Sequence, residues 1–399
     1  MTLTPGIPSF LREMNERRAL EVLRSQGSMH AAEIARNIGL SRTTTADILR
    51  GLVESGLIQE YLPGESDSKR ARSVFEAVSD LRVTLGIDIG SRFIRASVGN
   101  LNGELLSHNF VAVKGTALKD VIKDIHVAVE GALKEAGFKL KDVISICVGT
   151  PGVIDQSSGV VSIAGTVAAL DGVNLKTIIR DEFGIDPIIE NDVNVLTLAE
   201  QAAGYGRDVK NFAVISVGWG IGSGLVLNGT LHRGHHGAAG EIFYVPFGDP
   251  RDKHRTETNP SGDSIASLAR SLSTKFKNSV LAEPYSTIDI LEAAKNGDEL
   301  AKAVVDQEAH RVALYIAALS AITDVQLVVL SGGIGRRADF FMKPIRALVA
   351  EILPFPPRIE VSKLGDTGIL IGAIAIATTQ ACDRVFAEMH APDGATGAL

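Results

Sequence analysis

A glycine-rich segment in the middle of the chain, VISVGWGIGSGLVLNG from Val214 to Gly229, contains residue types that could handle phosphate. Its pattern predicts a strand, a glycine turn and a second strand, and backbone amides in such a turn can cradle an anion. Trp219, the one tryptophan of the chain, stands in that turn. A tryptophan buries on the order of 200 Å². We therefore expect the indole to fill space that a bound triphosphate would need.

A second set of residues with chemical potential lies in the first eighty positions. The segment SRTTTADILRG, from Ser41 to Gly51, places short polar and basic groups where the pattern predicts the first turn of a helix. Such groups reach base edges and phosphates when a helix enters the major groove. A basic cluster between two expected strands suits the phosphate backbone or the minor groove. The candidate DNA-binding residues are Ser41, Arg42, Thr43, Thr44, Arg50, Lys69, Arg70 and Arg72.

The elements that would position these residues form a winged helix-turn-helix over residues 9–79. One helix is expected from Pro8 to Gly27, and HAAEIARNIG predicts a second. Gly39 makes the tight turn before a third helix from Arg42 to Ser55. The segments LIQEYL and SVFEAV predict a two-stranded wing. The alternative is a three-helix module whose arginines are only solvated.

The rest of the chain predicts a mixed α/β domain of two related lobes. The segment NFAVISVGWGIGSGLVLNGTLHRG repeats the strand, glycine turn, strand and hairpin of VTLGIDIGSRFIRASVGNLNGEL. We place the first lobe at residues 80–190 and the second at 191–399, with a C-terminal helix that is a candidate to return to the first lobe. A long helical region is expected from Ser264 to Thr323.

The order of six motifs makes the chain resemble the ROK family of transcriptional repressors. In that family a winged helix-turn-helix is joined to a two-lobed, sugar-kinase-like α/β domain of the actin and hexokinase type. The resemblance implies regulation, most often repression, from a double-stranded DNA operator. The motifs are LGIDIG at 85–90, VGTPGVID at 148–155, ENDVN at 190–194, GWGIGSGLVLNG at 218–229, GAAGEI at 237–242 and LSGGIG at 330–335.

The resemblance also implies where a sugar would bind. Asp192 matches the family's catalytic base, and a helix cap is the alternative role for an aspartate at this place. Tyr244 stands where the family has a histidine, and the family's second glutamate falls at Ile265. A small-molecule sugar or sugar-phosphate effector is the ligand that this site would take. Its candidate residues are Asn191, Asp192, Glu241, Tyr244 and Trp219.

Two departures from the family pattern argue against catalysis. Arg92 and Trp219 occupy places where similar kinases carry threonines, so two hydroxyl donors for a phosphate are missing. We therefore expect Asp192 to be a vestigial base and the chain not to be an enzyme. Trp219 has two interpretations: its ring packs between the lobes, or it stacks on a bound ligand.

We expect neither a cofactor nor a metal. No cysteine lies between Cys147 and Cys382, so the three cysteines of the family's zinc site are missing. The cluster of His232, His235 and His236 is expected to be solvated.

The bulk composition is that of a globular protein without a membrane partner. A net charge of −7 excludes a surface coated in basic residues. The N-terminal segment MTLTPGIPSF lacks the pattern of a secretory signal, and apolar runs such as Gly368 to Ala377 fall short of a membrane span. We expect a cytoplasmic protein.

Three functions remain open. In the first, the chain is a DNA-binding regulator whose kinase-like domain senses an effector and forms a homodimer or homotetramer, because one reading module contacts few base pairs. In the second, it is an ATP-dependent sugar kinase with an extra N-terminal module. In the third, it is a regulator whose kinase-like domain is a ligand-free dimerisation scaffold.

Overall fold

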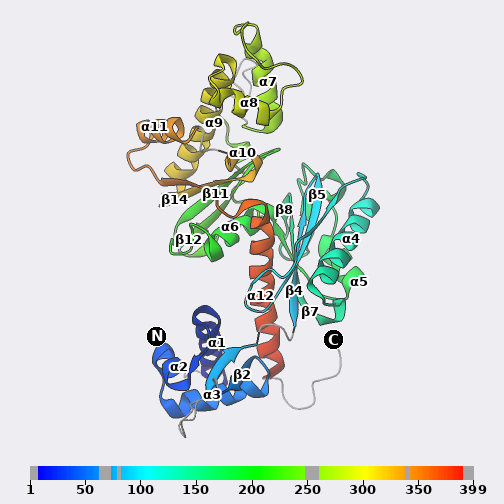
Figure 1. Cartoon of the computed structure of the whole chain (residues 1–399), viewed down its shortest axis with the longest axis vertical. Coiled ribbons are helices and arrows are strands. Elements are labelled where there is room, and N and C mark those ends of the chain that lie inside the picture. Colours follow the sequence, from blue (N-terminus) through cyan, green and yellow to red (C-terminus); the bar gives the residue numbers. More distant parts are fainter. Residues whose placement is uncertain (1–7, 63–72, 79–81, 248–259, 338–340, 390–399) are drawn as a thin grey trace.

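The computed structural model describes residues 8–62, 73–78, 82–247, 260–337 and 341–389. Figure 1 shows an N-terminal domain at one end and two α/β lobes at the other. The long C-terminal helix α12 (Gly368–Met389) runs between them. The expected fold class, a winged helix-turn-helix followed by a two-lobed α/β domain, is confirmed.

The N-terminal domain packs three helices against a small antiparallel sheet of order β1-β3-β2. The expected two-stranded wing is wrong in one respect, because a third strand pairs Met29 with Phe75 and His30 with Val74. A strand of two residues is too short to show an alternating pattern, so it could not be predicted from the sequence. The elements are α1 (Pro8–Gln26), β1 (Met29–His30), α2 (Ala31–Ile38), α3 (Arg42–Glu54), β2 (Ile58–Tyr61) and β3 (Val74–Ala77).

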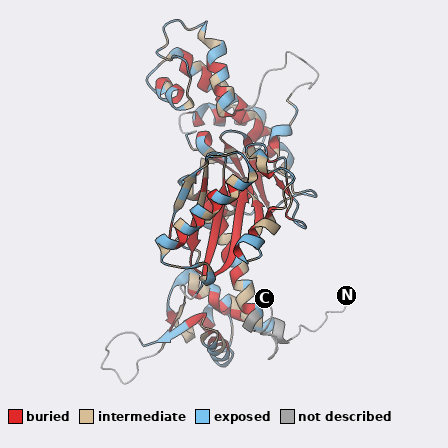
Figure 2. Cartoon of the chain, turned by 90° about the vertical axis from the view of Figure 1, so that its right-hand side faces the viewer, coloured by how far each residue is buried: buried red, intermediate tan, exposed pale blue. Residues whose placement is uncertain are grey.

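The first lobe is built on a five-stranded sheet of order β10-β7-β4-β5-β6. Its central strands are buried along their length, as Figure 2 shows, because helices cover both faces. Its main elements are β4 (Val83–Ile89), β5 (Phe93–Gly99), β6 (Asn109–Ala112), α4 (Leu118–Ala136), β7 (Val143–Thr150), α5 (Leu175–Phe183) and β10 (Ile188–Asn191). The small hairpin of β8 (Val153–Ile154) and β9 (Val161–Ser162) adjoins them.

The second lobe repeats this sheet with the order β15-β14-β11-β12-β13. In each lobe an antiparallel hairpin is followed by two parallel strands, so the internal repeat predicted from the sequence is confirmed. Its strands are β11 (Phe212–Val217), β12 (Ile221–Leu227), β13 (Thr230–Leu231), β14 (Leu327–Ser331) and β15 (Arg358–Val361). Its helices include α6 (Asp192–Ala203), α10 (Gly332–Gly335) and α11 (Met342–Ile352).

The long helical region expected between Ser264 and Thr323 consists of three helices. They are α7 (Gly262–Ser273), α8 (Thr287–Lys295) and α9 (Glu299–Thr323). Pro284 and Gly297 lie in the connections between them, where a helix is disfavoured. These helices pack on one another and on the second sheet to form the largest apolar core of the chain.

Helix α12 packs along α6 and along strands β4 and β7 of the first sheet. Close approach depends on small residues: a Cβ added at Gly372 would lie 2.0 Å from the carbonyl oxygen of Val195. Polar contacts add to this, since Ser145 Oγ donates to Gln380 Oε1 at 2.7 Å. Arg384 Nη1 also donates to the carbonyl oxygen of Ile144 at 2.6 Å. The helix is therefore held against the first lobe along most of its length.

The last turns of α12 reach the N-terminal domain. Phe386 is 1% exposed and belongs to the same apolar core as Leu20, Leu23 and Leu49. Arg17 lies over the Phe386 ring at 4.6 Å and forms an ion pair with Asp383. One helix thus connects the core of the lobes with the core of the N-terminal domain.

By length and hydropathy, the described part of the chain holds one helical span that could cross a membrane, Gly365–Ala387. This span is nearly all of α12 together with the short turn that precedes it. It is longer than the apolar run seen in the sequence, because polar residues at its end continue the helix. Its packing against α6, β4 and β7 accounts for its apolar side.

Candidate functional site

The first candidate surface is the start of α3. Gly39 adopts the left-handed conformation (φ 72°) that ends α2 and turns the chain into α3. Ser41 caps α3, since its Oγ accepts a hydrogen bond from the Thr44 amide at 3.1 Å and lies 2.8 Å from Thr44 Oγ1. Two predicted contact residues therefore also hold the start of the helix.

Arg42 and Thr43 are exposed on the same turn, and their side chains form no hydrogen bond or ion pair with the described residues. Arg50 is also exposed, further along α3, and its Nη2 lies 3.3 Å from Asp47 Oδ1. Ile48, Leu49 and Leu52 bury the opposite side of the helix. The arrangement presents Arg42 and Thr43 to solvent as the groups best placed to contact DNA. Lys69, Arg70 and Arg72 lie outside the described residues.

The second candidate site is the group of acids at the start of α6. Asp192 is partly buried, and burial raises its pKa to about 7, with further contributions from the nearby Asp88 and Glu241 carboxylates. Burial also raises the pKa of Glu241. A carboxyl group whose pKa lies near neutrality can accept a proton from a hydroxyl or donate one to it. The structure thus brings Asp192 and Glu241 together from distant parts of the sequence.

The helix cap at this place is Asn191 rather than Asp192. Asn191 Oδ1 accepts hydrogen bonds from the amides of Val193 (2.9 Å) and Asn194 (3.1 Å), while Nδ2 donates to the carbonyl oxygen of Gly152 (3.0 Å). The alternative role considered for Asp192, that of a helix cap, is therefore wrong, because Asn191 is the residue that caps α6. Asn191 has little hydrogen-bonding capacity left for a sugar hydroxyl.

The raised pKa of Asp192 predicts a pH-dependent cost in stability. The folded carboxyl holds its proton up to about pH 7, whereas the unfolded one loses it near 3.8, so stability falls as pH rises between these values. We expect Asp192→Asn to become more stable relative to the wild type from pH 4 to pH 8. The relative gain is up to roughly 4 kcal/mol, at ~1.4 kcal/mol per pKa unit.

Urea unfolding of both proteins at these two pH values measures this gain. Asp208→Asn, an exposed acid of the same lobe, is the matched control and should show no such trend. A gap between Asp192→Asn and the wild type that stays constant with pH would contradict the assignment.

Within the described residues, no side-chain hydrogen bond or ring contact joins Tyr244 or Trp219 to the acid group. Tyr244 is 61% exposed, and its ring meets Phe243 edge-on at 5.5 Å. Trp219 is 53% exposed, and the guanidinium of Arg92, from the first lobe, lies 5.1 Å from the centre of its ring. The ring therefore contacts the opposite lobe while about half of its surface is open to solvent.

Trp219 stands in the wall of a separate cleft of about 590 Å³ between the lobes. The ring forms part of the lining and leaves this volume open beside it. The cleft is lined by the glycine turns of both lobes and by Arg92, Arg95, Arg336 and Arg337, with Asp263 and Asp366 as the acids. Arg95, Arg336 and Arg337 lie outside the family motifs, so the sequence analysis did not select them as site residues. The one signal that could have found Arg336 and Arg337 is their position directly after the LSGGIG motif.

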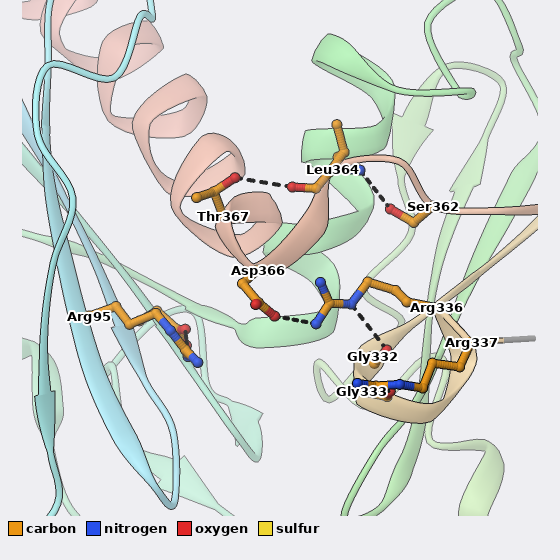
Figure 3. Close-up of polar contacts among 10 residues, drawn as sticks. Arg95, Gly332, Gly333, Arg336, Arg337, Ser362, Leu364, Asp366 and Thr367 are labelled. Carbon is orange, nitrogen blue, oxygen red and sulfur yellow. Dashed lines mark hydrogen bonds and ion pairs between the residues drawn. The ribbon is translucent and has the colours of Figure 1, made fainter. Parts of the chain in front are cut away.

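Two ion pairs involve arginines that line this cleft. Asp88 is buried near the end of β4, just before the first glycine turn, and accepts a hydrogen bond from Arg95 Nη1 at 2.8 Å. Arg336, at the end of α10, pairs with Asp366 at the start of α12 and donates to the carbonyl oxygen of Gly332 (Figure 3). Asp88 is therefore committed to an arginine, and the second lobe is tied to α12.

The described residues contain no group of three or more His, Cys, Asp or Glu side chains that could hold a metal ion. His232, His235 and His236 are all exposed, and the rings of the last two lie 4.4 Å apart.

Residues 84–380 match the model of the ROK family. The chain belongs to the ROK family. Residues 18–60 match the IclR helix-turn-helix domain, which places a DNA-binding module before the ROK domain. The winged-helix elements and the family resemblance predicted from the sequence are thereby confirmed.

Relatives of this ROK protein include both repressors and kinases. A xylose repressor of Caldicellulosiruptor bescii is 24% identical over 93% of this chain and 97% of its own length. A glucokinase of Halalkalibacterium halodurans is 30% identical over 66% of this chain and 83% of its own length. The crystal structure of a ROK family transcriptional regulator, a homologue of the E. coli MLC protein, shares the fold with a TM-score of 0.80 at 22% identity, over 95% of this chain and 98% of the other.

The matches to the repressor and to the regulator cover nearly the whole chain and so include its N-terminal domain, whereas the match to the glucokinase covers about two thirds of the chain. The chain is a ROK-family transcriptional regulator with a helix-turn-helix DNA-binding domain.

Proposed function

We propose that this regulator represses transcription from a DNA operator and releases it when a sugar binds beside Asp192 and Glu241. The observation that carries the proposal is the continuity of α12. Its first residue packs against α6, which begins at Asp192, and its Phe386 lies in the core beneath the reading helix α3. A ligand that prefers one arrangement of the lobes would shift the position of the reading head through this helix.

The class of effector follows from the site and the relatives. Asp192 and Glu241 supply acceptors for sugar hydroxyls, and relatives across nearly the whole chain are named xylose repressors. We therefore propose an aldose, with xylose and glucose as the first candidates. Tyr244, whose ring is exposed beside Phe243 three residues after Glu241, is a further candidate contact.

Loss of catalysis is also part of the proposal. Arg92 and Trp219 replace hydroxyl donors, and Asp88 is held by Arg95 rather than free to act on a nucleotide. The kinase relatives keep a second candidate function in view, that of an ATP-dependent sugar kinase. A cytoplasmic homodimer or homotetramer is the assembly that operator binding calls for, because two half-sites give useful affinity.

The test begins with selection of duplexes from a random library by the purified protein, which supplies the operator. Fluorescence anisotropy at fixed salt then measures its affinity with xylose or glucose added. We expect one of these sugars to weaken operator binding about 5- to 150-fold, the usual range of allosteric coupling. Asp192→Asn and Glu241→Gln should retain operator binding and lose the response.

Asp208→Asn is the matched control and should respond like the wild type. A coupled ADP-release assay with both sugars supplies the second arm. ATP-dependent turnover that Asp192→Asn abolishes would establish the kinase instead, and operator binding insensitive to every aldose tested would leave the domain as a ligand-free scaffold.

A further inference from the structure

The cleft around Trp219 has uneven charge. Arg95 and Arg336 are neutralised by Asp88 and Asp366. Arg92 and Arg337 also line the cleft, and neither forms an ion pair with a carboxylate of the described residues. The pKa of Asp366 is lowered mainly by its hydrogen bond to Arg336, and the charge of Arg337 adds to this effect from a longer distance. Arg92 lies against the indole, and Arg337 donates only to the carbonyl oxygen of Gly333 at 3.0 Å. The lining has four arginines and, besides Asp366, one other acid, Asp263, so positive charge remains in excess.

The two available guanidinium groups come from opposite lobes. Arg92 follows the first glycine loop, and Arg337 follows α10 in the second lobe. The backbone is open at Gly333 in the cleft lining, because a Cβ added there would meet nothing within 4 Å. A ligand can therefore approach the backbone as well as the arginines. Such a site offers more donors than the two oxygens of a carboxylate can accept, whereas a phosphate has three terminal oxygens.

The exposed face of Trp219 supplies the other half of the site. An indole beside a cation provides a flat apolar surface on which a base, or the CH face of a sugar, can stack. The cleft has the volume of an ordinary small-molecule pocket.

We propose that this cleft binds a small phosphate monoester without a divalent cation, with its phosphate between Arg92 and Arg337 and its uncharged part on Trp219. Metal independence follows from the pairing of Asp88 with Arg95, because the buried carboxylate at the end of β4 is already held by an arginine. The arginines neutralise the phosphate in place of a metal. The proposal does not depend on sugar binding at Asp192.

Trp219 is itself the probe, because the chain has a single tryptophan. The full-length protein is titrated in EDTA with glucose 6-phosphate and, separately, with AMP, which represent the two sources of a phosphate monoester. Quenching or enhancement of the indole fluorescence reports occupancy. Isothermal calorimetry supplies a second readout, because replacing Arg92 changes the surroundings of the fluorophore.

We expect at least one of the two compounds to bind, with affinity that falls as salt rises. Arg92→Ala and Arg337→Ala should each weaken binding by about tenfold or more, as expected for loss of a charge-assisted hydrogen bond. Arg207→Ala is the matched control: this arginine is also exposed and without a carboxylate partner among the described residues, but lies outside the cleft. It should bind like the wild type.

Three results would overturn the proposal: no binding of either compound at millimolar concentration, binding that requires Mg²⁺, or binding that survives both arginine variants. Asp192→Asn distinguishes the two sites. If it abolishes glucose 6-phosphate binding while Arg92→Ala leaves it intact, the ligand occupies the sugar site and the cleft does not bind it.

Discussion

Replacing Arg42 with alanine is expected to weaken operator binding by about 1–3 kcal/mol, the range for one base-contacting side chain. Arg42 is exposed on the first turn of α3, and no described residue competes for its guanidinium group. Its loss leaves the fold of the domain intact, because the cap at Ser41 and the buried side of α3 do not involve it.

Anisotropy with the selected operator measures this effect, and repeating it on single-base variants shows which kind of contact is lost. If Arg42 contacts a base, the variant discriminates less at one position; if it contacts a phosphate, binding weakens uniformly and the salt slope falls by about one. Arg207→Ala in the second lobe is the control. Unchanged affinity in Arg42→Ala would remove α3 from the DNA interface.

Phe386→Ala is expected to lower stability by about 3–5 kcal/mol, the usual cost of deleting a buried phenyl ring. The ring is 1% exposed among residues of α1 and α3, and Arg17 loses its contact with the ring as well. The loss should fall on the N-terminal domain, because the lobes have separate cores. The sugar response of operator binding should disappear with it.

Hydrogen exchange of α1 and α3 measures the local part of this effect, and calorimetric melting measures the whole. Phe110→Ala is the matched control, since this phenylalanine is 60% exposed on β6, and exposed substitutions usually change stability by less than about 0.5 kcal/mol. If α1 keeps its protection and the operator still responds to sugar, α12 is not the connection.

The features that follow from local sequence were predictable. Gly39 and Ser41 mark the turn and the cap of the helix-turn-helix, and the repeated glycine hairpins predicted two related lobes. Each of these depends on residues within about two turns of one another, where spacing carries the information.

The features that depend on contacts between distant parts of the chain could not be predicted from the sequence. Phe386 meets α1 across more than 360 positions, and no periodicity encodes that partner. Trp219 was correctly placed in the glycine turn, but its exposure depends on Arg92 and on the width of the cleft. The pairing of Asp88 with Arg95 was also missed, although the strands that carry them are neighbours in sequence, because alternation along β5 indicates a face and not a partner.

The place of Phe386 also bears on the synthesis of the protein. The three helices of the first domain leave the ribosome early, yet the ring that completes their core is translated only after both lobes. A nascent chain therefore carries its DNA-reading helix for most of translation without the aromatic anchor that fixes it. A messenger RNA truncated shortly before codon 386 would yield lobes with all their described strands and a DNA-reading domain that lacks its contact with Phe386.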